Sequence, residues 1–441
     1  MSDSTHSILR WVADPPFVAV GSEVMADEAI VLRTMATDMV AQGLVNALAR
    51  GLSEEEGADF FVDEGLAGIA AWYHLLEVLV DAGRLTPLLG EGGSVLLLRR
   101  AAGDTTVYSG HPRVGDESLV IAAESFVSRQ GERWRIECPT SRAVAELAPE
   151  LMSSLVSGEG ADSTALALLR EAGILVATDA VHSDLWPHHD RYFHWRTRRG
   201  GHPYVVGATY PLREEMPPLP VVEAPVHGKV FDIAALAGEP ADTLAAPLAD
   251  VLARRRSHRH GSRALTLREL ADFCLAHRAL EVVEVSANVE YPQSRRLYPG
   301  GGAGYEIDLY LTTRGVGALP AGVWWFDAVD PRLCRVSGDE ADVEAVFADA
   351  MIATGGAGSP DVLVTYALRM GRNSWKYEGM AYRLALLDAG VLYGHAYTVG
   401  SALGIGVCGL GNGDSGVLAS ILGGDPWQVV SVAEVMLSGA P

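Results

Sequence analysis

The sequence predicts an α+β protein whose strands are mostly antiparallel. In the C-terminal half, strand-like stretches occur both in pairs and alternating with helix-like stretches, which favours a mixed fold over a doubly wound parallel sheet. The 441 residues are 49% hydrophobic and 20% charged, so the chain can bury a large core. At this length, roughly two to four domains are expected.

The N-terminal half contains a repeated pattern. Residues 78–85 (VLVDAGRL) and 168–175 (LLREAGIL) each read as the end of an amphipathic helix, an Ala-Gly stop and the start of a strand. A winged-helix unit ends in this way, so we expect two winged-helix-like units, at 1–110 and 111–205. A third copy of the string at 386–392 leaves the alternative open that these are ordinary helix ends.

A connector and a linker should separate these units from the C-terminal domain, which is expected at 253–441. Residues 182–204 are rich in aromatic, arginine and histidine side chains. No spacing in them matches a zinc site, so a packed, hydrogen-bonded connector is favoured over metal binding by His188, His189, His194 and His202. Proline and alanine crowd the following stretch, which predicts an extended linker at 206–252.

The C-terminal domain begins with a helix signal at 265–277, where Thr266 and Glu269 form a capping box. Alternating or continuous apolar runs then predict strands, the first of them half-buried, at 305–311, 322–328, 361–368 and 427–437. A helical stripe is expected to start at Tyr377 and to continue through Met380, Leu384, Leu387 and Val391.

Charge and cysteine content exclude several functions. A formal net charge of −22 repels nucleic acid and anionic membranes. The four cysteines form no CxxC pair, which argues against a disulfide framework or a thiolate metal site and fits a reducing cytoplasm. The N-terminus lacks the basic start and apolar core of a signal peptide, and no run of 18 apolar residues predicts a transmembrane helix. We expect a cytoplasmic protein.

An arginine cluster and two glycine-rich stretches are candidate binding sites. In an acidic chain, RRRSHRHGSR (254–263) is better explained by a specific anion such as phosphate than by a solvated charge run. The glycines of YPGGGAGYE (298–306) precede a strand, which excludes a dinucleotide fingerprint. Both this stretch and SALGIGVCGLGNGD (401–414) could let the backbone approach a flat ligand, or could be simple turns.

The doublet Lys376-Tyr377 is a candidate proton-transfer pair. Lysine can act as a base if burial or nearby positive charge lowers its pKa, and tyrosine can exchange a proton in a buried network. Without context, a solvated lysine beside a core tyrosine is the favoured explanation of the doublet.

Taken in order, these pieces resemble the SagB-type, or thiazole/oxazole-forming, peptide dehydrogenases of the FMN-dependent nitroreductase superfamily. The similar segments are RRSHR (255–259), SRRLYPGGGAGYEIDLYL (294–311), GALPAGVWWFDAVDPRL (317–333), WKYEGMAYRLALLDAGVL (375–392) and ALGIGVCGLG (402–411). The resemblance covers residue 250 to the end, and the stretch 185–204 also looks like the segment that precedes the catalytic domain in this family.

The resemblance implies a homodimer with FMN bound between protomers, which oxidises the azoline rings that a cyclodehydratase partner forms in a precursor peptide. It implies that Lys376 and Tyr377 are catalytic. Arg256, Ser257 and Arg259 would hold the phosphate and ribityl chain. The cofactor-binding residues implied as a whole are Arg255, Arg256, Ser257, Arg259, Pro299, Gly300, Gly301, Gly302, Cys408, Gly409, Leu410 and Gly411.

The chain departs from the family pattern at several positions. A family serine is Gly300 here, the second family proline is Glu306, and the family glutamate is Asp308. The stretch 378–380 reads Glu-Gly-Met where an arginine commonly follows. Two other functions stay open: a general NAD(P)H-dependent nitroreductase, and a non-catalytic partner in a peptide-modifying complex.

Overall fold

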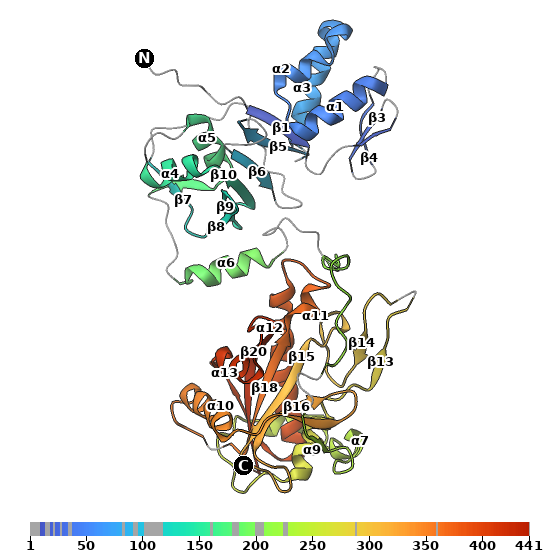
Figure 1. The fold of residues 1–441 in the computed structure, drawn as a ribbon, viewed down its shortest axis with the longest axis vertical. Coiled ribbons are helices and arrows are strands. Elements are labelled where there is room, and N and C mark those ends of the chain that lie inside the picture. Colours follow the sequence, from blue (N-terminus) through green and yellow to red (C-terminus); the bar gives the residue numbers. More distant parts are fainter. Residues whose placement is uncertain are drawn as a thin grey trace. The chain divides into compact units, whose positions relative to one another are not determined.

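A computed structural model of the chain shows two compact units, Met1–Val206 and Gly207–Pro441 (Figure 1). Every strand pair that it describes is antiparallel, and helices cover the sheets, so the predicted α+β class is confirmed. The residues that the structure describes are 9–13, 18–20, 23–26, 29–33, 38–81, 84–90, 96–100, 118–158, 162–178, 185–198, 207–223, 228–286, 289–358 and 360–440.

The first unit is built on a six-stranded sheet of order β1-β5-β6-β10-β9-β8. In that order the strands are Leu9–Ala13, Leu85–Leu89, Leu96–Arg100, Ala143–Leu147, Arg133–Cys138 and Phe126–Gln130. Its helices are α1 (Asp38–Arg50), α2 (Glu54–Asp59), α3 (Gly65–Asp81), α4 (Pro149–Ser157), α5 (Ser163–Glu171) and α6 (His188–Arg196). Two smaller sheets contain β2 (Val18–Val20), β3 (Glu23–Ala26) and β4 (Ala29–Arg33), and β7 (Leu119–Ile121) with β11 (Leu175–Ala177).

The repeated helix stops occur where the sequence predicts them. α3 ends at Asp81 and is followed by β5, while α5 ends at Glu171 and is followed by β11. The two expected winged-helix-like units nevertheless contribute strands to one sheet, because β6 pairs with β10. Apolar residues from both halves form one core cluster. The boundary expected between the units, at residues 110 and 111, lies outside the described residues.

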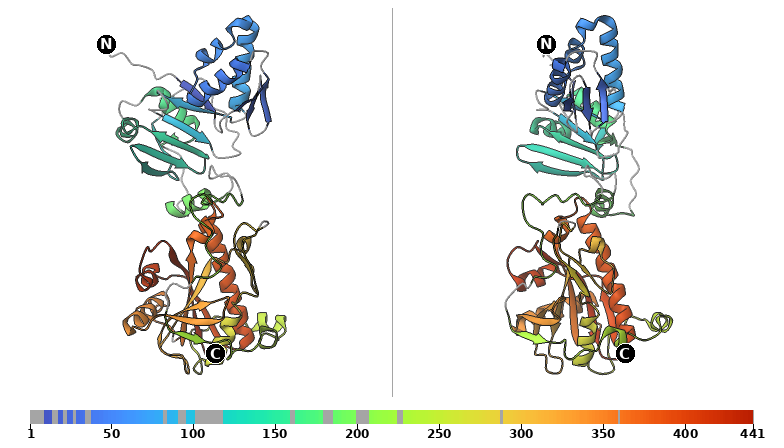
Figure 2. Two further views of the ribbon diagram at one scale, coloured as in Figure 1. Left: turned by 45° about the vertical axis from the view of Figure 1, so that its right-hand side comes forward. Right: turned by 90° about the vertical axis from the view of Figure 1, so that its right-hand side faces the viewer.

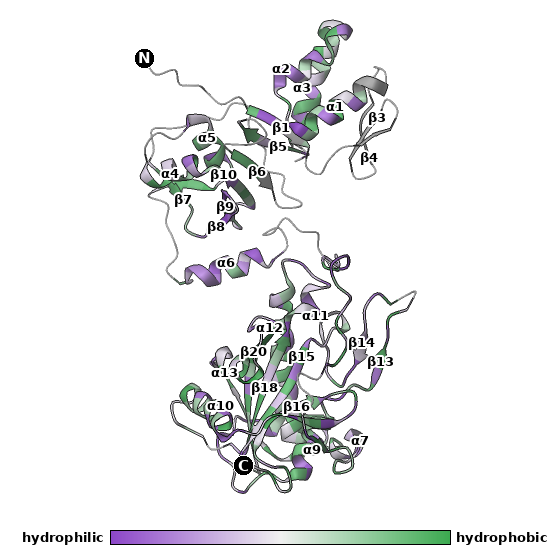
Figure 3. Cartoon of the chain, in the orientation of Figure 1, coloured by the Kyte–Doolittle hydropathy of each residue, from purple (hydrophilic) through white to green (hydrophobic). Residues whose placement is uncertain are grey.

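Helix α6 is the described part of the predicted connector. None of its residues is buried, and it is largely hydrophilic in Figure 3. It is held by polar contacts: Arg196 Nε lies 2.5 Å from Glu137 Oε2, and His188 Nε2 lies 3.2 Å from the carbonyl of Ser125. His202 lies outside the described residues. Within the part of the chain that is described, no three His, Cys, Asp or Glu side chains are grouped to hold a metal ion.

The second unit is a seven-stranded sheet of order β12-β17-β16-β15-β18-β20-β19 (Figure 2). In that order the strands are Val230–Asp232, Arg332–Ser337, Gly322–Asp327, Ile307–Thr313, Val362–Arg369, Val429–Ser438 and Gly406–Leu410. One face packs against α9 (Leu267–Leu275) and α12 (Ala381–Leu403), and the other against α10 (Glu340–Ala353) and α13 (Ser415–Leu422). The remaining elements are α7 (Pro240–Thr243), α8 (Leu248–Arg254), α11 (Met370–Ser374), a hairpin of β13 (Glu281–Val283) and β14 (Gln293–Arg295), and a 3₁₀ turn, η3 (Gly301–Ala303).

The predicted strands and the α9 capping box are present, but one strand differs in burial. The sequence predicts a half-buried strand at 305–311, whereas every residue of β15 is buried. Helices cover both faces of the sheet, so the polar positions of the alternation are also enclosed. Asp308 is accommodated there by an ion pair of 3.0 Å with Arg369 Nε and a hydrogen bond from the Trp325 indole.

The prediction of a helical stripe from Tyr377 is wrong in two respects: the helix starts later, and a different face of it is buried. α12 begins at Ala381, and its buried positions are mostly alanine, whereas Leu387 is 55% exposed. Small side chains let the helix approach the sheet closely, so they occupy the inner face. Although α12 is 23 residues long, no helix in the described ranges is long and apolar enough to cross a membrane.

The segment predicted as a linker packs on the second unit. The Arg369 guanidinium donates hydrogen bonds to the carbonyls of Pro220 and Val221, and β12 pairs with β17 at the edge of the sheet. Val221 and Ile233 are buried. The described part of 206–252 is therefore a strap along this unit, although much of it is extended, as its proline content predicts.

Candidate functional site

The Lys376-Tyr377 doublet lies in a turn between α11 and α12. The backbone amides of Thr209 and Tyr210 both donate to the carbonyl of Lys376, at 3.1 and 3.2 Å, and Tyr377 forms an isolated bridge with Ala208. The strap, rather than a helix, therefore fixes the doublet. This geometry lets both side chains reach the same loop, which contains Gly300, Gly301 and Gly302 and is called the first glycine loop below.

Lys376, Tyr377 and Tyr291 converge on Gly302. Lys376 Nζ donates to Tyr291 Oη at 2.7 Å and to the Gly302 carbonyl at 3.1 Å, and the Tyr291 hydroxyl also donates to that carbonyl. Gly302 has a φ of 57°. A Cβ at this position would lie 2.1 Å from Tyr377 Oη and 2.7 Å from Lys376 Nζ. Only glycine fits here, which is why the loop can lie against the doublet.

Burial gives the two side chains of the doublet opposite pKa shifts. It lowers the pKa of Lys376, an effect that the Glu290 carboxylate opposes and the Arg372 guanidinium reinforces. It raises the pKa of Tyr377, and the carboxyls of Glu306 and Asp388 raise it further. The amine is therefore shifted toward the neutral form that can accept a proton, while the phenol keeps its proton.

Sequence reasoning missed Tyr291 and the rarity of lysine. Of the 34 Lys and Arg residues, only Lys229 and Lys376 are lysines. Arginine cannot lose its proton near neutral pH, whereas a buried lysine can. A rare, half-buried lysine in an arginine-rich domain is thus a signal for base chemistry. Tyr291, by contrast, lies 85 residues from Lys376 and has no local motif.

The arginine cluster and the second glycine-rich stretch also come together. The backbone amide of His258 donates to the carbonyl of Val407 in β19 at 2.9 Å. Tyr397 Oη accepts a hydrogen bond from the Gly409 amide at 2.8 Å and lies 2.9 Å from Ser257 Oγ. Because the Tyr397 oxygen already accepts from Gly409, its own proton can go to Ser257. The Ser257 proton is then available to a ligand.

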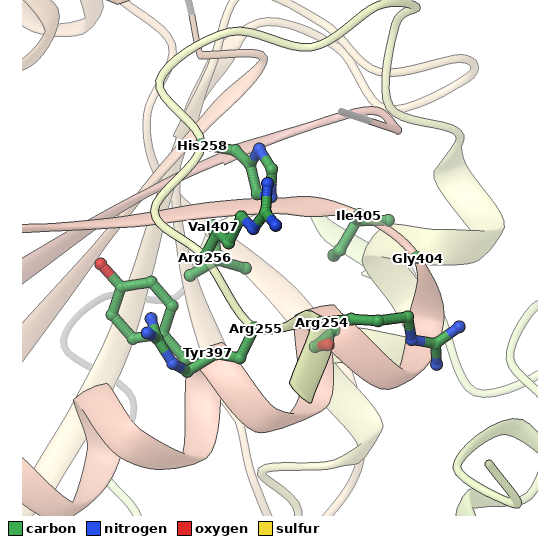
Figure 4. A pocket seen from close by; sticks show the side chains of 9 residues that line it. Arg254, Arg255, Arg256, His258, Tyr397, Gly404, Ile405 and Val407 are labelled. Atoms are coloured by element: carbon green, nitrogen blue, oxygen red, sulfur yellow. The ribbon is translucent and has the colours of Figure 1, made fainter. Parts of the chain in front are cut away.

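A pocket of about 130 Å³ lies beside this junction (Figure 4). The Arg255 guanidinium lies 5.4 Å from the centre of the Tyr397 ring, and Arg254 extends in the opposite direction. Neither of them nor Arg256 forms an ion pair with a described residue, although the chain is strongly acidic. The pocket is lined by Arg254, Arg255, Arg256, His258, Tyr397, Ser401, Gly404, Ile405 and Val407.

The remaining predicted cofactor residues are placed unevenly. Arg259 is exposed and does not line the pocket, whereas Arg254 does; Arg254 belongs to the predicted arginine cluster but not to the cofactor residues that the resemblance implies. Cys408 is 3% exposed and packs with α10 in an apolar cluster, as does Leu410, so both belong to the core. A Cβ on Gly411 would meet open space.

Pro299 and Gly300 line a small hollow with Glu306 and Asp388 behind the first glycine loop. The Gly301 amide donates to Asp388 Oδ2 at 2.7 Å. Asp388 and Tyr397 are both on α12, nine residues or about 13 Å of helix apart. One helix therefore carries contacts to both groups of site residues.

No family model and no curated protein matches the chain. Among solved structures, it is similar to a putative nitroreductase from Ralstonia eutropha (18% identity, 51% of this chain and 95% of that one, TM-score 0.38). It is also similar to the Escherichia coli microcin synthetase McbBCD complex with truncated pro-MccB17 bound (18% identity, 54% of this chain and 84% of that one, TM-score 0.35). A third similar structure is a putative nitroreductase from Desulfovibrio desulfuricans in complex with FMN (12% identity, 44% of this chain and 86% of that one, TM-score 0.28). These values are too low to assign the chain to a family.

Proposed function

We propose that this chain is an FMN-dependent dehydrogenase of the SagB type, which oxidises azoline rings to thiazoles or oxazoles in a ribosomally made peptide. The observation that carries the proposal is the convergence of Lys376 Nζ and Tyr377 Oη on Gly302, a loop position where no side chain fits. Azole formation removes two electrons and two protons from the ring, so it needs a base beside a hydride acceptor. FMN supplies that acceptor when it is bound.

The arginine pocket has suitable chemistry for the phosphate of FMN. Arg254, Arg255 and Arg256 lack carboxylate partners among the described residues, and guanidinium forks match phosphate oxygens. When the Tyr397 hydroxyl donates to Ser257 Oγ, the Ser257 proton is available to the phosphate. Cys408 and Leu410 are core residues, so their role is to place the backbone of β19.

The chain's own residues then have distinct tasks. Lys376 Nζ, with its pKa lowered by burial, takes the Cα proton of the azoline ring. Tyr291 Oη accepts from Lys376 and positions it, while the Tyr377 hydroxyl keeps its proton and orients the ring nearby. Hydride leaves the adjacent ring carbon, and dioxygen is the terminal electron acceptor.

We expect the enzyme to be a homodimer that receives its peptide from a cyclodehydratase. α12 has an outward face with exposed Tyr382 and Leu387, 41% and 55% exposed, which is suited to a second copy of the chain. Among the described strands of the first unit, β8 lies at an edge of the six-stranded sheet, and an extended precursor peptide could add to it, whereas the outer edge of β1 is already paired with Leu52 at Trp11.

Lys376→Ala should leave a yellow, FMN-loaded protein that no longer converts azoline to azole. The assay is the mass of a synthetic peptide with one thiazoline ring in air-saturated buffer, where each oxidation removes two hydrogens. Loss of a positioned general base should reduce the rate by about 10²–10⁴-fold.

Lys229→Ala is the matched control, because Lys229 is the only other lysine and its side chain is exposed. It should retain full activity. Full activity of Lys376→Ala would contradict the assignment. Rapid flavin reduction by NADPH without azoline oxidation would favour a general nitroreductase, and a wild-type protein that binds no FMN would favour a non-catalytic partner.

A further inference from the structure

Two carboxyl side chains, Glu306 and Asp388, are enclosed behind the first glycine loop. Glu306 is only 1% exposed. One of its oxygens accepts a hydrogen bond of 3.4 Å from the Asn373 amide, but no N–H or hydroxyl of the described residues donates to the other, Oε2. Asp388 Oδ2 accepts from the Gly301 amide at 2.7 Å. A buried carboxylate oxygen without a donor is costly, so this arrangement needs an explanation.

The explanation is a proton held between the two groups. Glu306 and Asp388 line the same small hollow, and two neighbouring carboxyls can share a hydrogen bond only if one of them retains its proton. Burial and the Asp388 carboxyl raise the pKa of Glu306 to about 7, although the Arg372 guanidinium opposes this. Burial also raises the pKa of Asp388. The carboxyl pair therefore gains or loses a proton near neutral pH.

The carboxyl pair borders the proton-handling doublet. Burial raises the pKa of Tyr377, and the charge of the pair raises it further. Burial and Tyr377 are larger causes of the raised pKa of Tyr291, to which Glu306 also contributes. Asp388 and Lys376 contact neighbouring residues of one loop, the amide of Gly301 and the carbonyl of Gly302. The loop is thus held between two sets of groups that can exchange protons.

We infer that the Glu306–Asp388 pair accepts the proton that Lys376 removes from the substrate. This inference rests on the proposed function. When the Cα–H bond of the ring breaks, the proton forms a new N–H bond at Lys376 Nζ. It then leaves the ammonium and forms an O–H bond on one carboxylate of the pair, which restores the neutral amine. The electrons leave as hydride in the dehydrogenation already described, and dioxygen finally receives them.

A purely structural role would be to hold the glycine loop through the Gly301 amide. Glu306→Gln separates the two roles, because glutamine keeps the shape of the side chain but cannot take up a proton. Asp388→Asn is the second variant, since the asparagine oxygen can still accept from Gly301. A structural role predicts unchanged pH dependence in both variants, whereas a proton acceptor predicts an altered one.

The protonation of the pair can be read without turnover. In the purified full-length protein, infrared difference spectra across neutral pH should show carboxyl bands from Glu306 and from Glu434. Burial and Asp349 raise the pKa of Glu434 to about 7 as well. Glu306→Gln should remove one band and leave the Glu434 band, and Glu434→Gln should do the reverse. If Glu306→Gln leaves both bands in place, the pair holds no titrating proton and the inference is overturned.

Kinetics test the transfer itself with the thiazoline peptide. Glu306→Gln and Asp388→Asn should each lower kcat by about tenfold, leave KM nearly unchanged and remove the inflection near neutral pH. The control is Glu344 on α10, which is exposed and forms an ion pair with Arg314. Glu344→Gln should behave as wild type. Unchanged kcat and pH profile in both variants would refute the inference while the proposed function stands. A wild-type protein that oxidises no azoline would refute the function, and the infrared bands would still report on the pair.

Discussion

Lys376 differs from the arginines of the domain because it can be neutral. Arg372 lies close by and is also buried, which lowers its pKa to about 10, yet at neutral pH it keeps its proton and donates to three backbone carbonyls. The Lys376 ammonium donates to Tyr291 and to Gly302, and the neutral amine keeps two N–H bonds with which it can still donate to both. The residue type therefore decides which cation can act as a base.

Glu290 should set the pH at which Lys376 becomes active. Its carboxylate raises the pKa of Lys376, so Glu290→Gln lowers that pKa further. Lys376 must be neutral to accept a proton, and activity rises as the pH passes through its pKa. The rise should therefore move to lower pH, by about half a pH unit at low salt.

The pH profile of kcat at low and high salt measures this effect. Glu290 is exposed, so on the order of 1 M salt should screen its charge and bring the wild-type profile toward that of the variant. Glu344→Gln again serves as the control, with no shift at either salt concentration. A shift to higher pH in Glu290→Gln would contradict the assignment of Lys376 as the base.

At the scale of elements, the site depends on a loop and a strap. η3 brings the glycines under the doublet, and the strap fixes the doublet through the amides of Thr209 and Tyr210. Neither contact is local in the sequence. The strap joins residues that are far apart in the sequence. Thr209 Oγ1, for example, donates a hydrogen bond of 3.0 Å to Glu378 Oε2, which lies 169 positions further along the chain.

Gly302→Ala should disable the doublet without removing the cofactor pocket. The new Cβ would collide with Tyr377 Oη and Lys376 Nζ, and a displacement of about 1 Å at a reacting group lowers activity by about 10²-fold. FMN content and azoline oxidation are to be measured together. Gly131→Ala is the matched control, since Gly131 has a φ of 60° but open space around its Cβ position. The hypothesis fails if Gly302→Ala is as active as Gly131→Ala.

At the scale of the whole molecule, a complete capping box begins a helix in each of the two compact units, as the described residues show. Ser53 and Glu56 cap α2 in the first unit, and Thr266 and Glu269 cap α9 in the second. Each cap satisfies backbone amides that the first turn of a helix leaves free.

Ser53→Ala and Thr266→Ala should each lower the free energy of unfolding of their own unit by about 1 kcal/mol. Scanning calorimetry of the full chain should resolve two transitions, of which each variant moves one. The two variants are controls for each other. A single transition moved equally by both would mean that the units unfold as one.

Local signals in the sequence determined the α+β class, the α9 capping box, the helix stops before β5 and β11, and the main strands of the second unit. These features follow from residue periodicity and from caps that involve neighbours in the chain. The candidate residues Lys376 and Gly302 were also identifiable, because a lysine-tyrosine doublet and a glycine run are local strings.

Tertiary structure alone decided the rest. It placed Tyr291 beside Lys376. It brought Arg254, and not Arg259, to the lining of the pocket. It also placed mostly alanine rather than leucine on the inner face of α12. It also enclosed Glu306 with Asp388, although 82 residues separate them in the sequence. These outcomes depend on packing between distant segments and on burial, which sets whether a charged group keeps its proton, and neither is written in a local pattern.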